Sequence, residues 1–179
     1  VGLAAGLDDA GEAILNLELV AALPKPPGFF DPRNPTERPV ETPEEGDDEV
    51  AAEEGAEEDE VIDEDAAKRS PMLSFSNTDM AFAGDVLVAG SYYGFNVYRL
   101  GEGGVPALVS SVVCPGGQGD VSIVGDLLIM SVEETRGRLD CGLDGVAGAE
   151  SPERFRGVRI FDISDLERPV QVGAVQTCR

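Results

Sequence analysis

Two stretches of the sequence decide the fold, Asp79-Met-Ala-Phe-Ala-Gly-Asp-Val-Leu-Val-Ala-Gly90 and Asp120-Val-Ser-Ile-Val-Gly-Asp-Leu-Leu-Ile-Met-Ser131, which align at an offset of 41 residues. In both stretches a Gly-Asp pair separates two short apolar runs. Two turn-forming residues between apolar runs are typical of a tight β-hairpin. Each stretch therefore predicts a strand, a turn and a second strand.

The residues that follow each stretch repeat as well. Residues 94–100 match residues 157–163, and residues 106–112 match residues 169–175, both at an offset of 63. The larger offset implies an insertion of 22 residues in the second copy, within 132–156. The repeating unit therefore has four short strands.

A third, partial copy of the unit stands near the N-terminus. Residues 17–23 match residues 106–112, and the Pro26 and Gly28 that follow match Pro115 and Gly117. We therefore expect a single N-terminal strand equivalent to the fourth strand of a unit.

The repeats predict an all-β fold of antiparallel four-stranded blades of the β-propeller type. A period of 40 to 45 residues with four strands per unit is typical of propeller blades. The alternative is a plain antiparallel β-domain with two similar hairpin pairs. About two blades and one N-terminal strand are present, too few to close a ring. We expect the natural protein to continue past Arg179 or to complete its core against a partner.

One segment of the second copy resembles a known family. Val158-Arg-Ile-Phe-Asp-Ile-Ser-Asp-Leu-Glu-Arg-Pro169, followed by Val172-Gly173, resembles the LVIVD-repeat proteins. The first copy departs from the pattern, with Arg99 and Gly101 in place of Asp and Ser, so we expect a different turn there. The resemblance implies an exported, propeller-like protein and implies no reaction.

The chain divides into three parts by composition. Residues 1–28 form an N-terminal segment with one blade strand, residues 29–74 a Pro-rich and acidic low-complexity insertion, and residues 75–179 the two repeats. The section from Glu41 to Asp65 contains no Lys or Arg. Such a block repels itself and buries too little apolar surface to fold alone. It is either a solvated linker or an acidic arm that lies on a basic partner or holds Ca²⁺ loosely; it lacks the spacing of an EF-hand loop.

Composition limits the chemistry. The formal net charge is −22, so phosphates are repelled and a nucleic-acid partner is not expected, whereas a basic partner is. The chain has no histidine, which excludes His-based catalysis and the usual zinc and haem ligands from this chain. We predict no catalytic residue, cofactor or metal.

Location is read from the chain start and the cysteines. The chain begins with Val1 and shows no signal sequence, so we expect a mature periplasmic or extracellular chain from which a signal peptide has been removed. No span is apolar enough to predict a transmembrane segment. Cys114, Cys141 and Cys178 lack metal-binding spacing, which predicts one disulfide and one remaining thiol.

Strand order predicts where the insertions lie. In an antiparallel four-stranded unit, the connection from the second to the third strand and the connection from one unit to the next leave the sheet at the same face. The acidic insertion, the insertion in 132–156 and all three cysteines should therefore share one face. A disulfide from Cys141 to Cys114 or Cys178 would pin the inserted loop, with a contribution of about 2–4 kcal/mol.

Candidate interaction residues lie on this predicted face. They are Glu133, Glu134, Arg136, Arg138, Arg154, Phe155 and Arg156. Two interpretations stay open: Phe155 is an exposed contact anchor flanked by arginines, or Phe155 packs beneath its own loop and the arginines pair with nearby acids.

The leading functional prediction is a non-enzymatic binding or structural subunit that docks through this face to a larger envelope or membrane-bound protein complex. One alternative is an accessory subunit of a respiratory or photosynthetic electron-transfer complex, whose acidic arm attracts a basic carrier. Another is a propeller-based hydrolase or oxidoreductase that uses Asp79, Asp120 and Glu133 or Glu134; the first two occupy equivalent positions, which favours a structural role for them.

Overall fold

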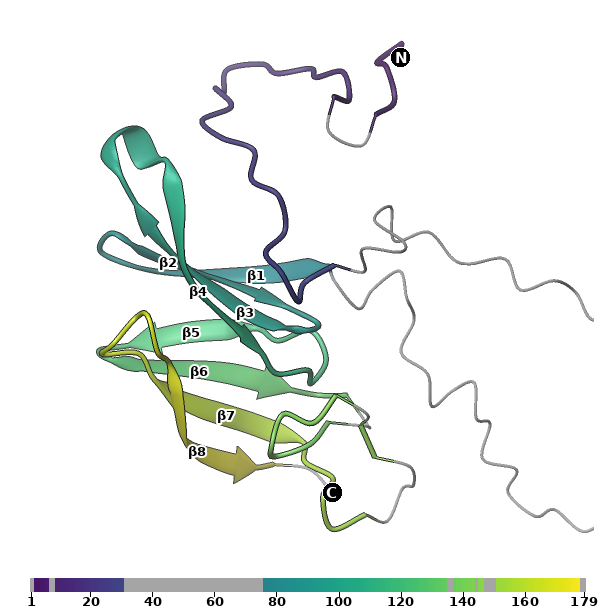
Figure 1. The fold of residues 1–179 in the computed structure, drawn as a ribbon, viewed down its shortest axis with the longest axis vertical. Helices are drawn as coiled ribbons and strands as arrows, with labels where there is room; N and C mark the ends of the chain where they lie inside the picture. The colour runs from purple at the N-terminus through teal and green to yellow at the C-terminus, as the bar shows by residue number, and fades with distance from the viewer. Residues whose placement is uncertain are drawn as a thin grey trace, which may run out of the picture.

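The protein folds into two antiparallel four-stranded sheets, shown in Figure 1. The computed structural model describes residues 2–6, 9–30, 76–134, 137–143, 145–146 and 151–177. The first sheet has the order β1 (Asn77–Ala83), β2 (Val86–Ser91), β3 (Gly94–Leu100) and β4 (Pro106–Val113). The second sheet has the order β5 (Val121–Val124), β6 (Leu127–Val132), β7 (Gly157–Asp162) and β8 (Val170–Gln176). The expected all-β class and the four-stranded antiparallel units are confirmed.

The repeated Gly-Asp pairs form the expected two-residue hairpins. Ala83 pairs with Val86 across the first turn, and Val124 pairs with Leu127 across the second. The two turn glycines have φ values of 60° and 59°, in the left-handed region that favours glycine. Local turn chemistry therefore fixes the start of both sheets.

The turns between the third and fourth strands differ between the sheets, as the departure from the repeat pattern predicts. In the second sheet, the Ser164 side chain and the Ser164 backbone both lower the pKa of the Asp162 carboxyl by hydrogen bonding. The backbone bond runs from Ser164 N to Asp162 Oδ1 at 2.9 Å. In the first sheet, Arg99 at the equivalent position instead pairs with Asp85, and a short 3-10 helix η1 (Glu102–Gly104) makes the turn.

The core lies between the sheets, which pack face to face. Alternate residues of each strand point to this junction, with Val88, Phe95 and Val97 from the first sheet and Leu128 and Phe161 from the second. The rings of Phe95 and Phe161 meet edge to face with centroids 4.9 Å apart. β5 is the strand of the second sheet that lies nearest the first sheet, and it contacts β1 and β2 (Figure 1).

The expected N-terminal strand is wrong. Residues 17–23 have no regular secondary structure, and their leucines are exposed. A strand is stable only when its backbone pairs with a neighbouring strand, and no sheet edge among the described residues pairs with this segment. Most of the Pro-rich and acidic insertion, including the block 41–65, lies outside the described residues.

Within the described ranges, the protein has no helix that is long and apolar enough to cross a membrane.

Candidate binding site on the loop face

Three inter-strand connections leave the sheets at one end, which we call the loop face: β2 to β3, β4 to β5 and β6 to β7. The remaining connections lie at the other end, the turn face. The N-terminal segment reaches the loop face too, since the ring of Phe29 meets that of Tyr93 in the β2–β3 turn at 6.4 Å. The contact supports the prediction that connections between units share a face with those between second and third strands.

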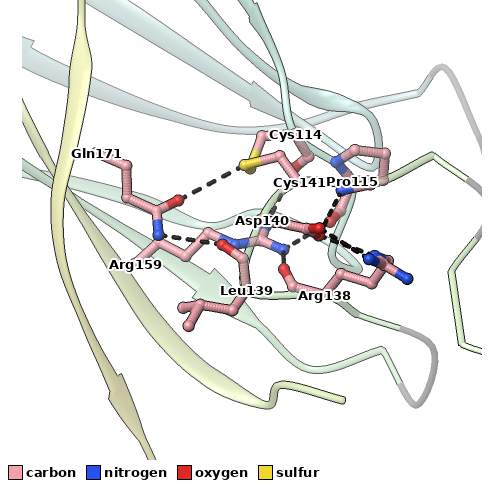
Figure 2. The surroundings of a disulfide bond; sticks show 9 residues. Cys114, Pro115, Arg138, Leu139, Asp140, Cys141, Arg159 and Gln171 are labelled. Carbon is pink, nitrogen blue, oxygen red and sulfur yellow. Dashed lines mark hydrogen bonds and ion pairs between the residues drawn. A yellow bond between two sulfur atoms is a disulfide. The ribbon is translucent and has the colours of Figure 1, made fainter. Parts of the chain in front are cut away.

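A disulfide joins two of these connections. Cys114, at the end of β4, is bonded to Cys141 in the β6–β7 loop, with their Cα atoms 4.4 Å apart (Figure 2). Cys114 is fully buried in the core between the sheets. The bond therefore anchors the inserted loop to the core, as one of the two expected pairings requires; Cys178 lies outside the described residues.

Arg159 of β7 is fully buried beneath the disulfide (Figure 2). Its Nη1 donates to Cys114 O at 3.2 Å, and its Nη2 donates to Pro115 O at 3.0 Å and also to Arg138 O. The Arg159 Cζ lies 6.0 Å from the centroid of the Phe155 ring. One guanidinium therefore connects the β4–β5 connection to the β6–β7 loop through backbone carbonyls, whose dipoles compensate part of the cost of burying its charge.

Arg138 forms the surface layer above this buried group. Its guanidinium binds Asp140 through two hydrogen bonds of 2.8 and 2.7 Å and pairs with Glu153 at 2.5 Å. The hydrogen bonds from Arg138, and one from Gly142 N, hold the pKa of the Asp140 carboxyl far below its ordinary value. The same two acids raise the pKa of Arg138. Both ends of the described part of the loop are therefore linked through one arginine.

We expect this ion pair to make the stability of the protein pH-dependent. The folded-state pKa of Asp140 lies below its unfolded value of about 3.8, so the stabilisation is present above that pH and is lost as the pH falls through the folded value. Asp140→Asn should lower the melting temperature at about pH 7, and the gap to the wild type should narrow in acid. Thermal unfolding followed by circular dichroism at a series of pH values measures the gap.

Glu102→Gln, which neutralises an exposed acid on the turn face, is the matched control for that experiment. A gap between wild type and Asp140→Asn that stays constant from neutral to acid pH would contradict the assignment.

The remaining contacts fasten the base of the inserted loop. Phe155 N donates to Gly137 O at 2.8 Å, next to an isolated β-bridge between Arg138 and Arg154. Arg156 Nε donates to Glu133 O at 3.1 Å, so the two ends of the insertion are held together. Gln171 Nε2 of β8 donates to Leu139 O at 3.1 Å (Figure 2).

The interpretation of Phe155 as an exposed contact anchor is wrong. Its side chain is only 4% exposed and lies under the loop, against the Arg159 guanidinium. The ring fills space between the loop and β7. Its burial is favourable because the free energy of an aromatic side chain falls when it moves from water into such a pocket. The alternative interpretation, in which Phe155 packs beneath its own loop, is confirmed. Of the two flanking arginines, Arg156 donates to the backbone oxygen of Glu133.

The candidate interaction residues Glu133 and Glu134 lie at the start of the insertion and contact the β4–β5 connection. Glu133 Oε2 accepts from Ser131 Oγ at 3.1 Å and its Oε1 from Gln118 N, and Glu134 N donates to Gly116 O at 3.0 Å. Glu133 and Glu134 thus fasten the β4–β5 connection. Arg136 lies outside the described residues.

Three residues of this face escaped the sequence analysis. Leu139 and Leu143 in the loop are 48% and 58% exposed, and the charged Asp140 and Glu153 of the same loop are exposed as well. Arg159 was overlooked although a signal existed, because it is a charged residue within an apolar strand pattern. The loop face therefore exposes two leucines as well as charged side chains, and protein interfaces combine apolar and polar residues.

The candidate catalytic residues Asp79 and Asp120 have structural partners, Asp79 through its carboxylate and Asp120 through its backbone. Asp79 Oδ2 of β1 accepts a hydrogen bond from Val121 N of β5 at 3.1 Å, which ties the two sheets together. Asp120 N donates to Ser131 Oγ at 3.0 Å, and Asp120 O accepts from Ser131 N. Within the described ranges, no three His, Cys, Asp or Glu side chains are grouped so that they could hold a metal ion.

Fold and site together define an all-β protein of two face-packed four-stranded sheets, with a loop face clamped by a disulfide and a buried arginine. The sequence matches no protein-family model and no curated protein, and the structure matches no solved structure.

Proposed function

We propose that this protein is a non-enzymatic, extracytoplasmic binding or structural subunit whose loop face docks to a larger envelope or membrane-bound protein complex. The observation that carries the proposal is the construction of the loop face. The inserted loop is attached to the core by the Cys114–Cys141 bond and by Arg159, while Leu139 and Leu143 remain exposed. A loop that is rigid before binding loses less entropy on association, so such a surface binds tightly for its area.

The propeller type, the resemblance to LVIVD-repeat proteins and the exported location are parts of the same proposal. The four-stranded antiparallel units packed face to face support the blade interpretation. The disulfide supports export, because such bonds persist in oxidising compartments. The net charge of −22 favours a partner with a basic patch.

A pull-down from the solubilised envelope of the source cells tests the docking role. The tagged chain should recover a defined set of membrane-complex subunits in stoichiometric amounts. Leu139→Asp together with Leu143→Asp should reduce this recovery by roughly tenfold or more, the loss expected when an interface loses about 1.4 kcal/mol.

The matched control is Val105→Asp, which introduces the same charge at an exposed apolar residue beside η1 on the turn face. Circular dichroism should show unchanged folding for all variants. Recovery of the chain without companions, or an equal loss in the Val105→Asp variant, would overturn the assignment of the loop face.

A further inference from the structure

Within the part of the chain that the structure describes, each sheet has one apolar face that no other element covers. We call the side of the first sheet that points away from the second sheet the rear face, and the side of the second sheet that points away from the first the front face. On the rear face, Met80 and Phe82 are 61% and 60% exposed. On the front face, Leu127 and Val175 are exposed as well. Exposed apolar side chains gathered on one face of a sheet are typical of an interaction surface.

The rear face of the first sheet corresponds, position by position, to a face that the second sheet buries. At the repeat offsets of 41 and 63, Met80 corresponds to Val121, which is 5% exposed. In the same way Leu87 corresponds to the fully buried Leu128, and Tyr98 to the buried Phe161. The first sheet therefore presents to solvent the side by which the second sheet packs on its neighbour.

The reverse holds for the front face of the second sheet. Val88, Phe95 and Val97 are fully buried at the junction between the sheets. Their counterparts in the second sheet are Ile129, Val158 and Ile160, which lie on the uncovered front face and are only partly buried. The second sheet therefore presents the side by which the first sheet packs on its neighbour.

The N-terminal segment also marks the rear face as a junction. Pro26 is buried at the loop end of the first sheet, as Pro115 is at the loop end of the second. Gly28 and Gly117, at matching positions, have φ values of 87° and 113°. The second sheet is entered by a connection that comes from the first sheet. The first sheet has the same kind of connection, although no described sheet precedes it.

We propose that the rear face of the first sheet and the front face of the second are the two halves of one head-to-tail junction, and that a second copy of this chain occupies them. Val158 of one copy would then meet Tyr98 of the other, as Phe95 meets Phe161 within the chain. In this arrangement, β8 of the neighbouring copy occupies the position in which the repeat pattern placed residues 17–23, the fourth strand of a preceding unit. Residues 17–23 stay outside the sheets, as they do in the structure. The interface is heterologous, so it closes into a ring or extends into an open array according to its rotation.

The net charge of the chain determines how this association depends on salt concentration. Each copy carries −22, so two copies repel one another at low salt. Because salt screens this repulsion and leaves the apolar contact intact, association strengthens with ionic strength. An interface held by ion pairs shows the opposite salt dependence.

Sedimentation velocity of the full chain at about 100 µM protein, in about 0.1 M and about 1 M salt, tests the proposal. We expect dimers or larger species, with a greater share at the higher salt concentration. Phe82→Asp on the rear face and Val175→Asp on the front face should each reduce association by at least tenfold, whereas Val105→Asp on the turn face should not. A chain that stays monomeric in both buffers overturns the proposal.

A mixing experiment separates the head-to-tail junction from a symmetric one. The Phe82→Asp variant keeps an intact front face and the Val175→Asp variant an intact rear face, so an equimolar mixture should form a one-to-one complex although each alone is monomeric. Self-association of either single variant means that a face pairs with itself, which overturns the head-to-tail assignment. The test uses no loop-face variant, so its result is independent of the proposed docking role.

Discussion

Replacing Arg159 by alanine is expected to lower the free energy of unfolding by about 3 kcal/mol. The change leaves the buried carbonyls of Cys114, Pro115 and Arg138 without their donor and opens a cavity beside Phe155. Each carbonyl without a partner costs about 1–3 kcal/mol, offset in part because a buried charge is also removed. Urea unfolding should show a lower midpoint with an unchanged slope.

Two further variants separate the causes. Arg159→Met keeps most of the side-chain volume but donates no hydrogen bond. It should therefore avoid the part of the stability loss that comes from the cavity, and remain less stable than the wild type. Arg99→Ala, on β3, removes a solvent-exposed pair with Asp85 and should change the free energy of unfolding little, because solvent screens such pairs. Equal stability of Arg159→Ala and wild type would show that the buried guanidinium does not stabilise the folded protein.

Removing the disulfide in the Cys114→Ala, Cys141→Ala double variant is expected to lower the free energy of unfolding by about 2–4 kcal/mol. The bond closes a loop of 27 residues in sequence, and this constraint reduces the entropy of the unfolded chain. The loss of two sulfur atoms next to the core adds a smaller packing term, because Cys114 is fully buried. Chemical denaturation of both proteins under oxidising conditions measures the difference.

Cys178→Ala is the matched control, because it removes a cysteine and leaves the observed bond in place. We expect it to unfold with the wild type, and peptide mapping without reductant should recover a fragment that links Cys114 to Cys141. A fragment that links Cys178 to either of them, or a Cys178→Ala variant as unstable as the double variant, would contradict the pairing.

The loss of either the Cys114–Cys141 disulfide or the Arg159 hydrogen bonds should also weaken docking through the loop face. Without the disulfide or Arg159, Leu139 and Leu143 sit on a loop with more conformations to lose on binding. The same pull-down that tests the docking role should show this loss while the sheets remain folded.

Features that depend on neighbouring residues follow from the amino-acid sequence alone. The Gly-Asp pairs specify tight turns because glycine tolerates a positive φ, and alternating apolar residues specify strands with one buried face. The two offsets then placed all eight strands and the insertion in the second copy. The position of the loop face also followed, because antiparallel strand order sets the end at which each connection leaves a sheet.

Features that depend on residues far apart in the sequence became clear only in the folded chain. Residues 17–23 match a strand in sequence, yet they form none, and no sheet edge among the described residues pairs with their backbone. The sequence left Cys141 two possible partners and left Phe155 either exposed or packed; the folded loop selected Cys114 and buried the ring against Arg159. Turns and strands are local, whereas burial and cross-linking are fixed by chain segments that meet only after the sheets have packed.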